Sequence, residues 1–147
     1  MGVISDRMAD EWEEGLPKPD WIYRLIEKAE NSSSLKNRIW AIAALGNSRD
    51  PRAVRSLIGC CRDRDPAIRR CAIDGLKCIG SGRSVEALAS LLRDKGEPPD
   101  IRLSAAAALA SIKSFGAIAE LRNRYTDPDE EEGLRSYIGS ELENVKL

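Results

Sequence analysis

An internal repeat of arginine and leucine is the feature of this sequence that most constrains its fold. Four segments superpose with their first arginine in register: RIWAIAALG, RRCAIDGLK, RLSAAAALA and RSYIGSELE. These arginines are 31, 33 and 33 residues apart, a period typical of helical repeat proteins. A leucine stands seven positions after each of them, at Leu45, Leu76, Leu109 and Leu142.

Each repeat is predicted to contain two amphipathic helices. Apolar residues recur nine and twelve positions after the first three leucines, as Val54 and Leu57 do after Leu45, and this is helical spacing. The expected helices are residues 20–30, 36–46, 51–62, 66–79, 83–93, 99–113, 116–126 and 131–144.

The breaks between these segments carry helix start and stop signals. Asp50, Asp65 and Asp127 each precede a proline, and an aspartate followed by proline is typical of a helix N-terminus. Gly46 and Gly80 are interpreted as helix C-termini, where a residue free to adopt positive φ is favoured.

The expected fold class is all-α, a short right-handed α-solenoid. A hairpin of two helices cannot bury its apolar face alone, so about three and a half to four hairpins must stack. We expect residues 1–19 to be a flexible N-terminal segment and residues 20–147 to form a single repeat domain. Its units are expected at residues 20–35, 36–64, 65–96, 97–127 and 128–147.

The stretch NSRDPRAVRSLIGCCRDRDPAIRRCAIDGLKCIG, residues 47–80, resembles the HEAT-like repeats of the phycobilisome (PBS) lyases. It has their Asp-Pro turn, apolar second helix, D-x-D corner, and Ile-Arg opening the next first helix. The resemblance covers residues 36–126 and is specific for fold rather than for function. It implies that second helices line the concave surface and that an Asp and Arg ladder joins neighbouring corners. The ladder residues are Arg38, Asp63, Arg69, Asp94, Arg102, Asp127 and Arg135, for which an anion site is the alternative interpretation.

Histidine is absent from the sequence, which excludes several kinds of chemistry within these 147 residues. No His-based triad, His-ligated zinc or imidazole general base can form. The HEAT-like deoxyhypusine hydroxylases hold their iron through His-Glu motifs, so we expect no such activity here. The prediction is a chain without catalytic residues, cofactor or metal.

Four cysteines fall within nineteen positions, which raises the question of a metal site. Cys71 and Cys78 would lie on one face of a helix, about 10 Å apart along its axis. Tetrahedral zinc needs its sulfur ligands within about 4 Å of one another, so we expect structural positions instead. A disulfide between Cys61 and Cys71 is the alternative, which a reducing cytoplasm would keep open. The fourth cysteine is Cys60.

Basic residues concentrate in the middle of the chain. Residues 38–126 carry a net charge of +7, whereas both ends are acidic. Arg55 and Arg62 are seven positions apart on one second helix and share a face, and Arg93 is the repeat equivalent of Arg62. We expect Arg55, Arg62 and Arg93 to attract acidic peptides or phosphates from the concave surface, and a solvated charged face is the alternative.

These features favour a noncatalytic protein–protein interaction or scaffold module over an enzyme. We expect the partner to be a protein, and an acidic protein is one option. Two alternatives stay open: an accessory subunit of a lyase or cofactor-attachment complex, and nucleic-acid binding through the basic concave surface. No segment has the apolar length to cross a membrane, so we expect a soluble cytoplasmic protein that does not associate with membranes.

Small residues in the first helices are expected to let successive units pack closely. Ala72 and Ala105 stand three positions after their arginines, where successive first helices are expected to approach closely. Replacing either with leucine should overpack the stack and lower the free energy of unfolding by about 1 to 3 kcal/mol. Urea unfolding measures this loss, and a variant as stable as the parent would contradict the close approach.

Overall fold

The structure is a computed structural model that describes residues 20–145, and its helices follow the repeat of the sequence. The segment predicted to be flexible, residues 1–19, lies outside the described residues. The elements are α2 (Trp21–Asn31), α3 (Leu35–Ser48), the 3₁₀ helix η1 (Pro51–Ala53), α4 (Val54–Cys60), α5 (Pro66–Ile79), η2 (Gly82–Ser84), α6 (Val85–Arg93), α7 (Pro99–Ile112), α8 (Phe115–Thr126) and α9 (Glu132–Glu143).

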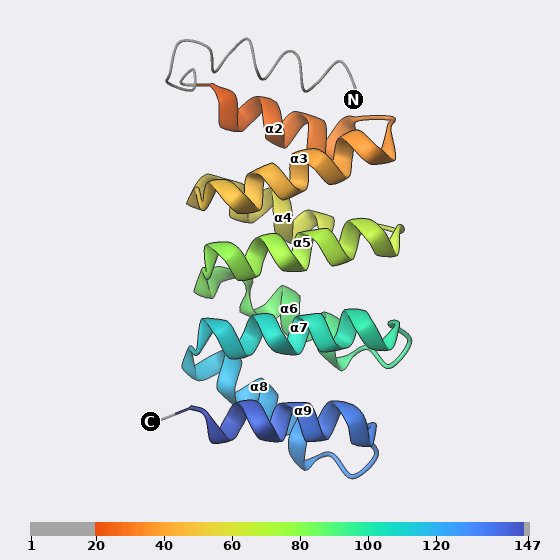
Figure 1. Ribbon diagram of the computed structural model, residues 1–147, viewed down its shortest axis with the longest axis vertical. Coiled ribbons are helices and arrows are strands. Elements are labelled where there is room, and N and C mark those ends of the chain that lie inside the picture. Colours follow the sequence, from red (N-terminus) through yellow and green to blue (C-terminus); the bar gives the residue numbers. More distant parts are fainter. Residues whose placement is uncertain (1–19, 146–147) are drawn as a thin grey trace.

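The helices form two layers that stack in chain order (Figure 1). The first helices of the units, α3, α5, α7 and α9, lie toward the viewer, and the second helices, α4, α6 and α8, lie behind them. Residues 20–145 contain no strand, and the predicted fold class, a short right-handed α-solenoid, is confirmed. None of the helices described is long and apolar enough to cross a membrane.

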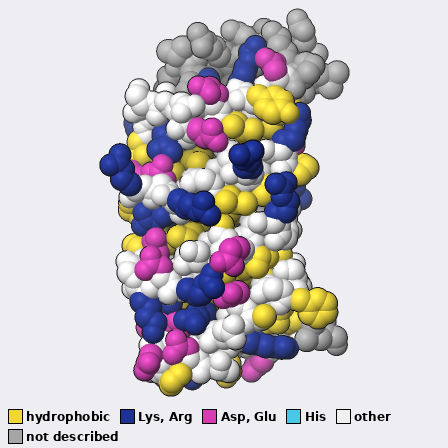
Figure 2. All heavy atoms as spheres, turned by 180° about the vertical axis from the view of Figure 1, so that it is seen from behind, with side chains coloured by type: hydrophobic (Ala, Val, Ile, Leu, Met, Phe, Trp, Pro, Cys, Tyr) yellow, Lys and Arg dark blue, Asp and Glu magenta, His cyan; other side chains and the backbone are white. Residues whose placement is uncertain are grey.

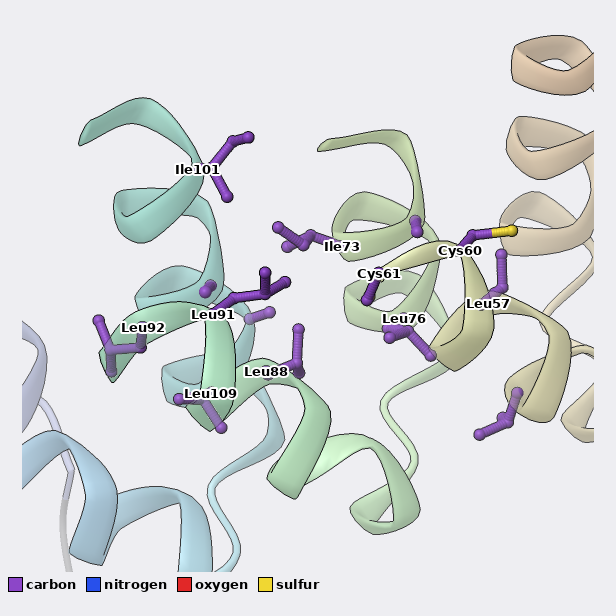
Figure 3. Packing of buried hydrophobic residues seen from close by; sticks show 14 of the residues in the cluster. Leu57, Cys60, Cys61, Ile73, Leu76, Leu88, Leu91, Leu92, Ile101 and Leu109 are labelled. Carbon is purple, nitrogen blue, oxygen red and sulfur yellow. The ribbon is translucent and has the colours of Figure 1, made fainter. Parts of the chain in front are cut away.

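A single hydrophobic core runs between the two layers through all the units. The repeat leucines Leu45, Leu76 and Leu109 are fully buried, and their burial stabilises the fold by about 1.5 to 3 kcal/mol each. Figure 3 shows side chains from α4, α5, α6 and α7 gathering in the space between these helices. The core is continuous because the buried apolar residues of successive units form one cluster.

Two of the three aspartates that were predicted to cap helix N-termini do so. Asp50 begins η1 and Asp65 begins α5, and each side chain accepts a hydrogen bond of 2.9 Å from the amide two residues on. The prediction was wrong at Asp127, because Pro128 lies in a turn and α9 begins only at Glu132.

The helix ends agree with the prediction at Gly80 and contradict it at Gly46. Gly80 has a φ of 71° after α5, as expected of a left-handed cap. Helix α3 instead runs past Gly46 to Ser48, and Arg49 adopts the left-handed conformation with a φ of 55°. Gly46 lies where α3 crosses α5: a Cβ atom added there would be 2.5 Å from the Cα atom of Gly75. This close crossing needs a residue without a side chain.

A side chain at position 46 should disturb the crossing of α3 and α5. Gly46→Ala should lower the free energy of unfolding by about 1 to 3 kcal/mol, because the obstacle is backbone that cannot rotate away. Gly59→Ala in α4 is the control: its Cβ atom would meet nothing within 4 Å, so helix propensity should stabilise it by about 0.5 to 1 kcal/mol. Chemical denaturation measures both, and equal effects would contradict the role of Gly46.

Candidate functional site

Helix α4 and the turn that follows it expose two unpaired arginines on the layer of second helices. Val54, Leu57 and Cys60 face the core, so helical spacing leaves Arg55 on the outside. The predicted helix 51–62 ends at Cys60, so Arg62 lies in the turn after α4 and not on a shared helix face with Arg55. Both arginine side chains are exposed, and neither makes a hydrogen bond or ion pair with any residue in the described part of the chain. They are therefore cations available to an external anion.

Arg93 differs from its repeat equivalent, Arg62, although the sequence suggested the same role. Its guanidinium contacts the carboxylate of Glu86 at 2.6 Å and that of Glu120 at 3.5 Å. These neighbours neutralise Arg93, so the structure does not add a third unpaired cation to Arg55 and Arg62. The superposition of the two arginines alone could not reveal this, because the positions beside Arg62 that correspond to Glu86 and Glu120 are Arg55 and Ala87, which are not acidic.

Further basic residues surround α4. Arg49 and Arg64, which flank the helix, are exposed, as is Arg83 of η2, which packs against α4. Arg52 is paired with Asp50 at 2.6 Å. On the face shown in Figure 2, several lysine and arginine side chains lie at the height of α4, and acidic side chains lie both above and below them. Arg83, the repeat equivalent of Arg52, was not among the candidate binding residues predicted from the sequence. We call Arg49, Arg55, Arg62, Arg64 and Arg83 the α4 basic face.

The first three predicted ladder arginines each join two corners of the solenoid, whereas Arg135 contacts only the preceding one. Each one donates backward to a backbone carbonyl of the preceding corner, and the first three also donate forward to a carboxylate of the next. The backward acceptors are the carbonyls of Ala29 for Arg38 (2.9 Å), Asp63 for Arg69 (2.9 Å), Leu92 for Arg102 (2.8 Å) and Tyr125 for Arg135 (3.2 Å). The forward acceptors are Asp63 for Arg38 (2.6 Å), Glu97 for Arg69 (2.9 Å) and Glu130 for Arg102 (2.7 Å).

The acids of the ladder differ from the prediction at two of three corners. Asp94 and Asp127 do not contact the ladder arginines, whose partners there are Glu97 and Glu130, three residues further on. The aspartates instead close the corners, because Asp63, Asp94 and Asp127 each accept a hydrogen bond of 2.8 to 2.9 Å from the amide two residues later. The superposition identified a repeated turn residue and not the ion pair.

We call the ion pairs Arg38–Asp63, Arg69–Glu97 and Arg102–Glu130 the first, second and third rungs of the ladder. Equivalent cavities lie beside the first two rungs, and Asp63 lines both of them. The first, of about 270 Å³, is lined by Arg38, Ser56, Cys60 and Asp63, among others. The second, of about 300 Å³, contains the repeat equivalents Arg69, Ala87 and Leu91. Charged side chains line both cavities, so they suit a small polar group rather than a large apolar cofactor.

The third rung is buried. The side chains of Arg102 and Glu130 are 7% and 1% exposed, against 19% and 21% for Arg38 and Asp63. Burial acts to raise the pKa of Glu130, but hydrogen bonds from Arg102 and from the Glu131 amide outweigh it and hold the pKa below its usual range. Glu130 therefore stays ionised at neutral pH.

The cysteines do not converge on one site. Cys60 and Cys61 are buried, and burial raises the pKa of their thiols to about 11 and about 12, which keeps both protonated at neutral pH. Figure 3 shows Cys60 directing its sulfur toward the first unit. Cys71 is half-buried and Cys78 is exposed, so Cys78 lies outside the core. All four are free, and residues 20–145 hold no cluster of three His, Cys, Asp or Glu side chains suited to a metal.

Stacked helical hairpins joined by arginines define this protein as an α-solenoid of two-helix repeats. A family model for HEAT repeats matches residues 22–99, more than half of the chain, and the chain belongs to that family. Human deoxyhypusine hydroxylase in complex with glycerol has a similar structure, with a TM-score of 0.73 and 26% sequence identity. The match covers 83% of this chain and 42% of that one, so this chain spans less than half of the enzyme. No curated protein sequence matches the chain.

The buried pair Arg102–Glu130 should contribute more to stability than the more exposed pair Arg38–Asp63. Glu130→Gln should lower the free energy of unfolding by about 3 to 5 kcal/mol at neutral pH, because Arg102 keeps its charge without a buried counterion. Asp63→Asn, at the more exposed first rung, should cost no more than about 1 kcal/mol.

Acid titration gives a second measurement of the same rung. The folded pKa of Glu130 lies below its unfolded value, so its contribution is complete above the unfolded pKa and is lost as pH falls through the folded one. Unfolding followed between neutral pH and pH values below the ordinary glutamate range should show a smaller loss in Glu130→Gln than in the parent. Equal losses in both proteins would contradict this assignment.

Proposed function

We propose that this HEAT-repeat chain is a noncatalytic interaction module that binds an acidic protein segment through the α4 basic face. The observation that carries the proposal is the pair Arg55, on α4, and Arg62, in the turn after it, both exposed without a counterion among residues 20–145. Guanidinium groups donate paired hydrogen bonds to carboxylates, which gives such a surface orientation as well as attraction. The four free cysteines are consistent with a cytoplasmic location, which we propose with it.

A nucleic acid is a less favoured partner for the same surface. A duplex presents regularly spaced phosphates and is bound by basic residues that continue along its backbone. Here Glu86 and Glu120 neutralise Arg93, so the basic surface does not continue onto α6. An acidic peptide needs only the few cations on and beside α4.

The resemblance to the phycobilisome lyase type of HEAT-like repeat supports an alternative proposal. In it the chain would be an accessory subunit of a lyase or cofactor-attachment complex. The charged lining of the two ladder cavities does not favour a tetrapyrrole, and no His-ligated site can form within these 147 residues. Titration with haem or a bilin tests this alternative, and an unchanged absorbance spectrum would remove it.

The test of the interaction proposal is a charge-reversal experiment. Fluorescence anisotropy of a labelled polyglutamate peptide should show roughly tenfold weaker binding to the double variant Arg55→Glu, Arg62→Glu than to the parent. The control is Lys36→Glu, Lys77→Glu, which changes net charge equally with exposed residues of α3 and α5. Equal losses in the two variants would reduce the effect to net charge and overturn the proposal. Tighter, steeply salt-dependent binding of a DNA duplex would favour a nucleic-acid partner instead.

A further inference from the structure

A cavity of about 480 Å³ lies at the junction of α7 and α8, lined by none of the residues of the α4 basic face. Its lining combines three apolar residues, Phe115, Ile118 and Ala119, with two cations, Lys113 and Arg122. Phe115 is 91% exposed, whereas the other large exposed hydrophobic residues in the described part of the chain are between 36% and 58% exposed. We call this site the Phe115 pocket.

The repeat indicates that the core does not require this aromatic side chain. Phe115 occupies the position held by Pro51 and Gly82 in the preceding units, at the start of the second helix. The fold therefore forms there without any large side chain. An exposed phenylalanine beside an apolar cavity is unfavourable in a free monomer, and such surfaces mark sites of protein–protein contact.

The two cations of the Phe115 pocket are unpaired. The side chains of Lys113 and Arg122 are exposed and make no ion pair or hydrogen bond with a residue in the range 20–145. Lys113 is also held in a left-handed conformation, with a φ of 58°, at the position where the preceding unit has Gly80. Lys113 therefore adds a positive charge to the lining of a largely apolar cavity.

We propose that the Phe115 pocket binds a linear acidic segment of a partner protein through one apolar side chain flanked by carboxylates. The apolar side chain packs against Phe115, Ile118 and Ala119, and the carboxylates pair with Lys113 and Arg122. Charge complementarity selects this occupant, because a purely apolar segment would leave both cations without counterions as the pocket is covered. The inference concerns α8 and goes beyond the function proposed for α4.

The experiment uses the full chain and a labelled peptide of glutamates around one central tryptophan. Phe115→Ala should weaken binding of this peptide roughly tenfold, because exposed aromatic anchors dominate interface energies. The charge reversals Lys113→Glu and Arg122→Glu should each weaken it as well. The matched control is Leu35→Ala in α3, an exposed apolar truncation far from the pocket that should leave binding unchanged. Circular dichroism checks that the variants keep their helix content.

Three results would overturn the inference. One is equal affinity of the parent and Phe115→Ala. Another is equal affinity of the parent for the acidic peptide and for a peptide with glutamines in place of its glutamates. The third is self-association that Phe115→Ala abolishes in sedimentation, which would assign the pocket to a second copy of this chain. The polyglutamate peptide, which has no apolar anchor, separates the two proposals: its binding should depend on Arg55 and Arg62 and not on Phe115.

Discussion

The packing of each first helix on the first helix of the next unit is the contact on which the rest of this solenoid depends. One hairpin has too little apolar surface to remain folded alone, so every unit must share its core with its neighbours. Where α3 meets α5, the glycines Gly46 and Gly75 let two backbones approach closely. That stacking fixes the positions of the second helices behind it. It thereby determines which side chains face solvent on α4, α6 and α8.

The sequence predicted the fold well because the core repeats in register. A leucine seven residues after each arginine identifies the buried side of a helix, and aspartate before proline identified the starts of η1 and α5. Gly46 was misassigned because glycine favours both a left-handed cap and a close helix crossing. Only the path of α3 past that residue distinguishes the two roles.

The candidate site was harder to predict, because long charged side chains reach residues outside the repeat register. The partners of Arg69 and Arg102 come from corners of variable composition, at Glu97 and Glu130, which the superposition did not align with Asp63. Arg93 has the same register as Arg62 but different neighbours. Periodicity therefore located the arginines and their exposure. It could not show which of them already have a counterion.

The burial of the ladder ion pairs increases along the chain, and this gives the pairs different sensitivity to salt. Exposure of the ion pair falls from 19% and 21% at Arg38–Asp63 to 16% and 10% at Arg69–Glu97, and then to 7% and 1% at Arg102–Glu130. Dissolved salt screens an exposed pair but hardly reaches a buried one. Ionic strength therefore weakens the Arg38–Asp63 pair more than the Arg102–Glu130 pair. The ion pair whose contribution depends most on salt is thus the one beside α4, where Arg62 and Arg64 of the α4 basic face flank Asp63 in the sequence.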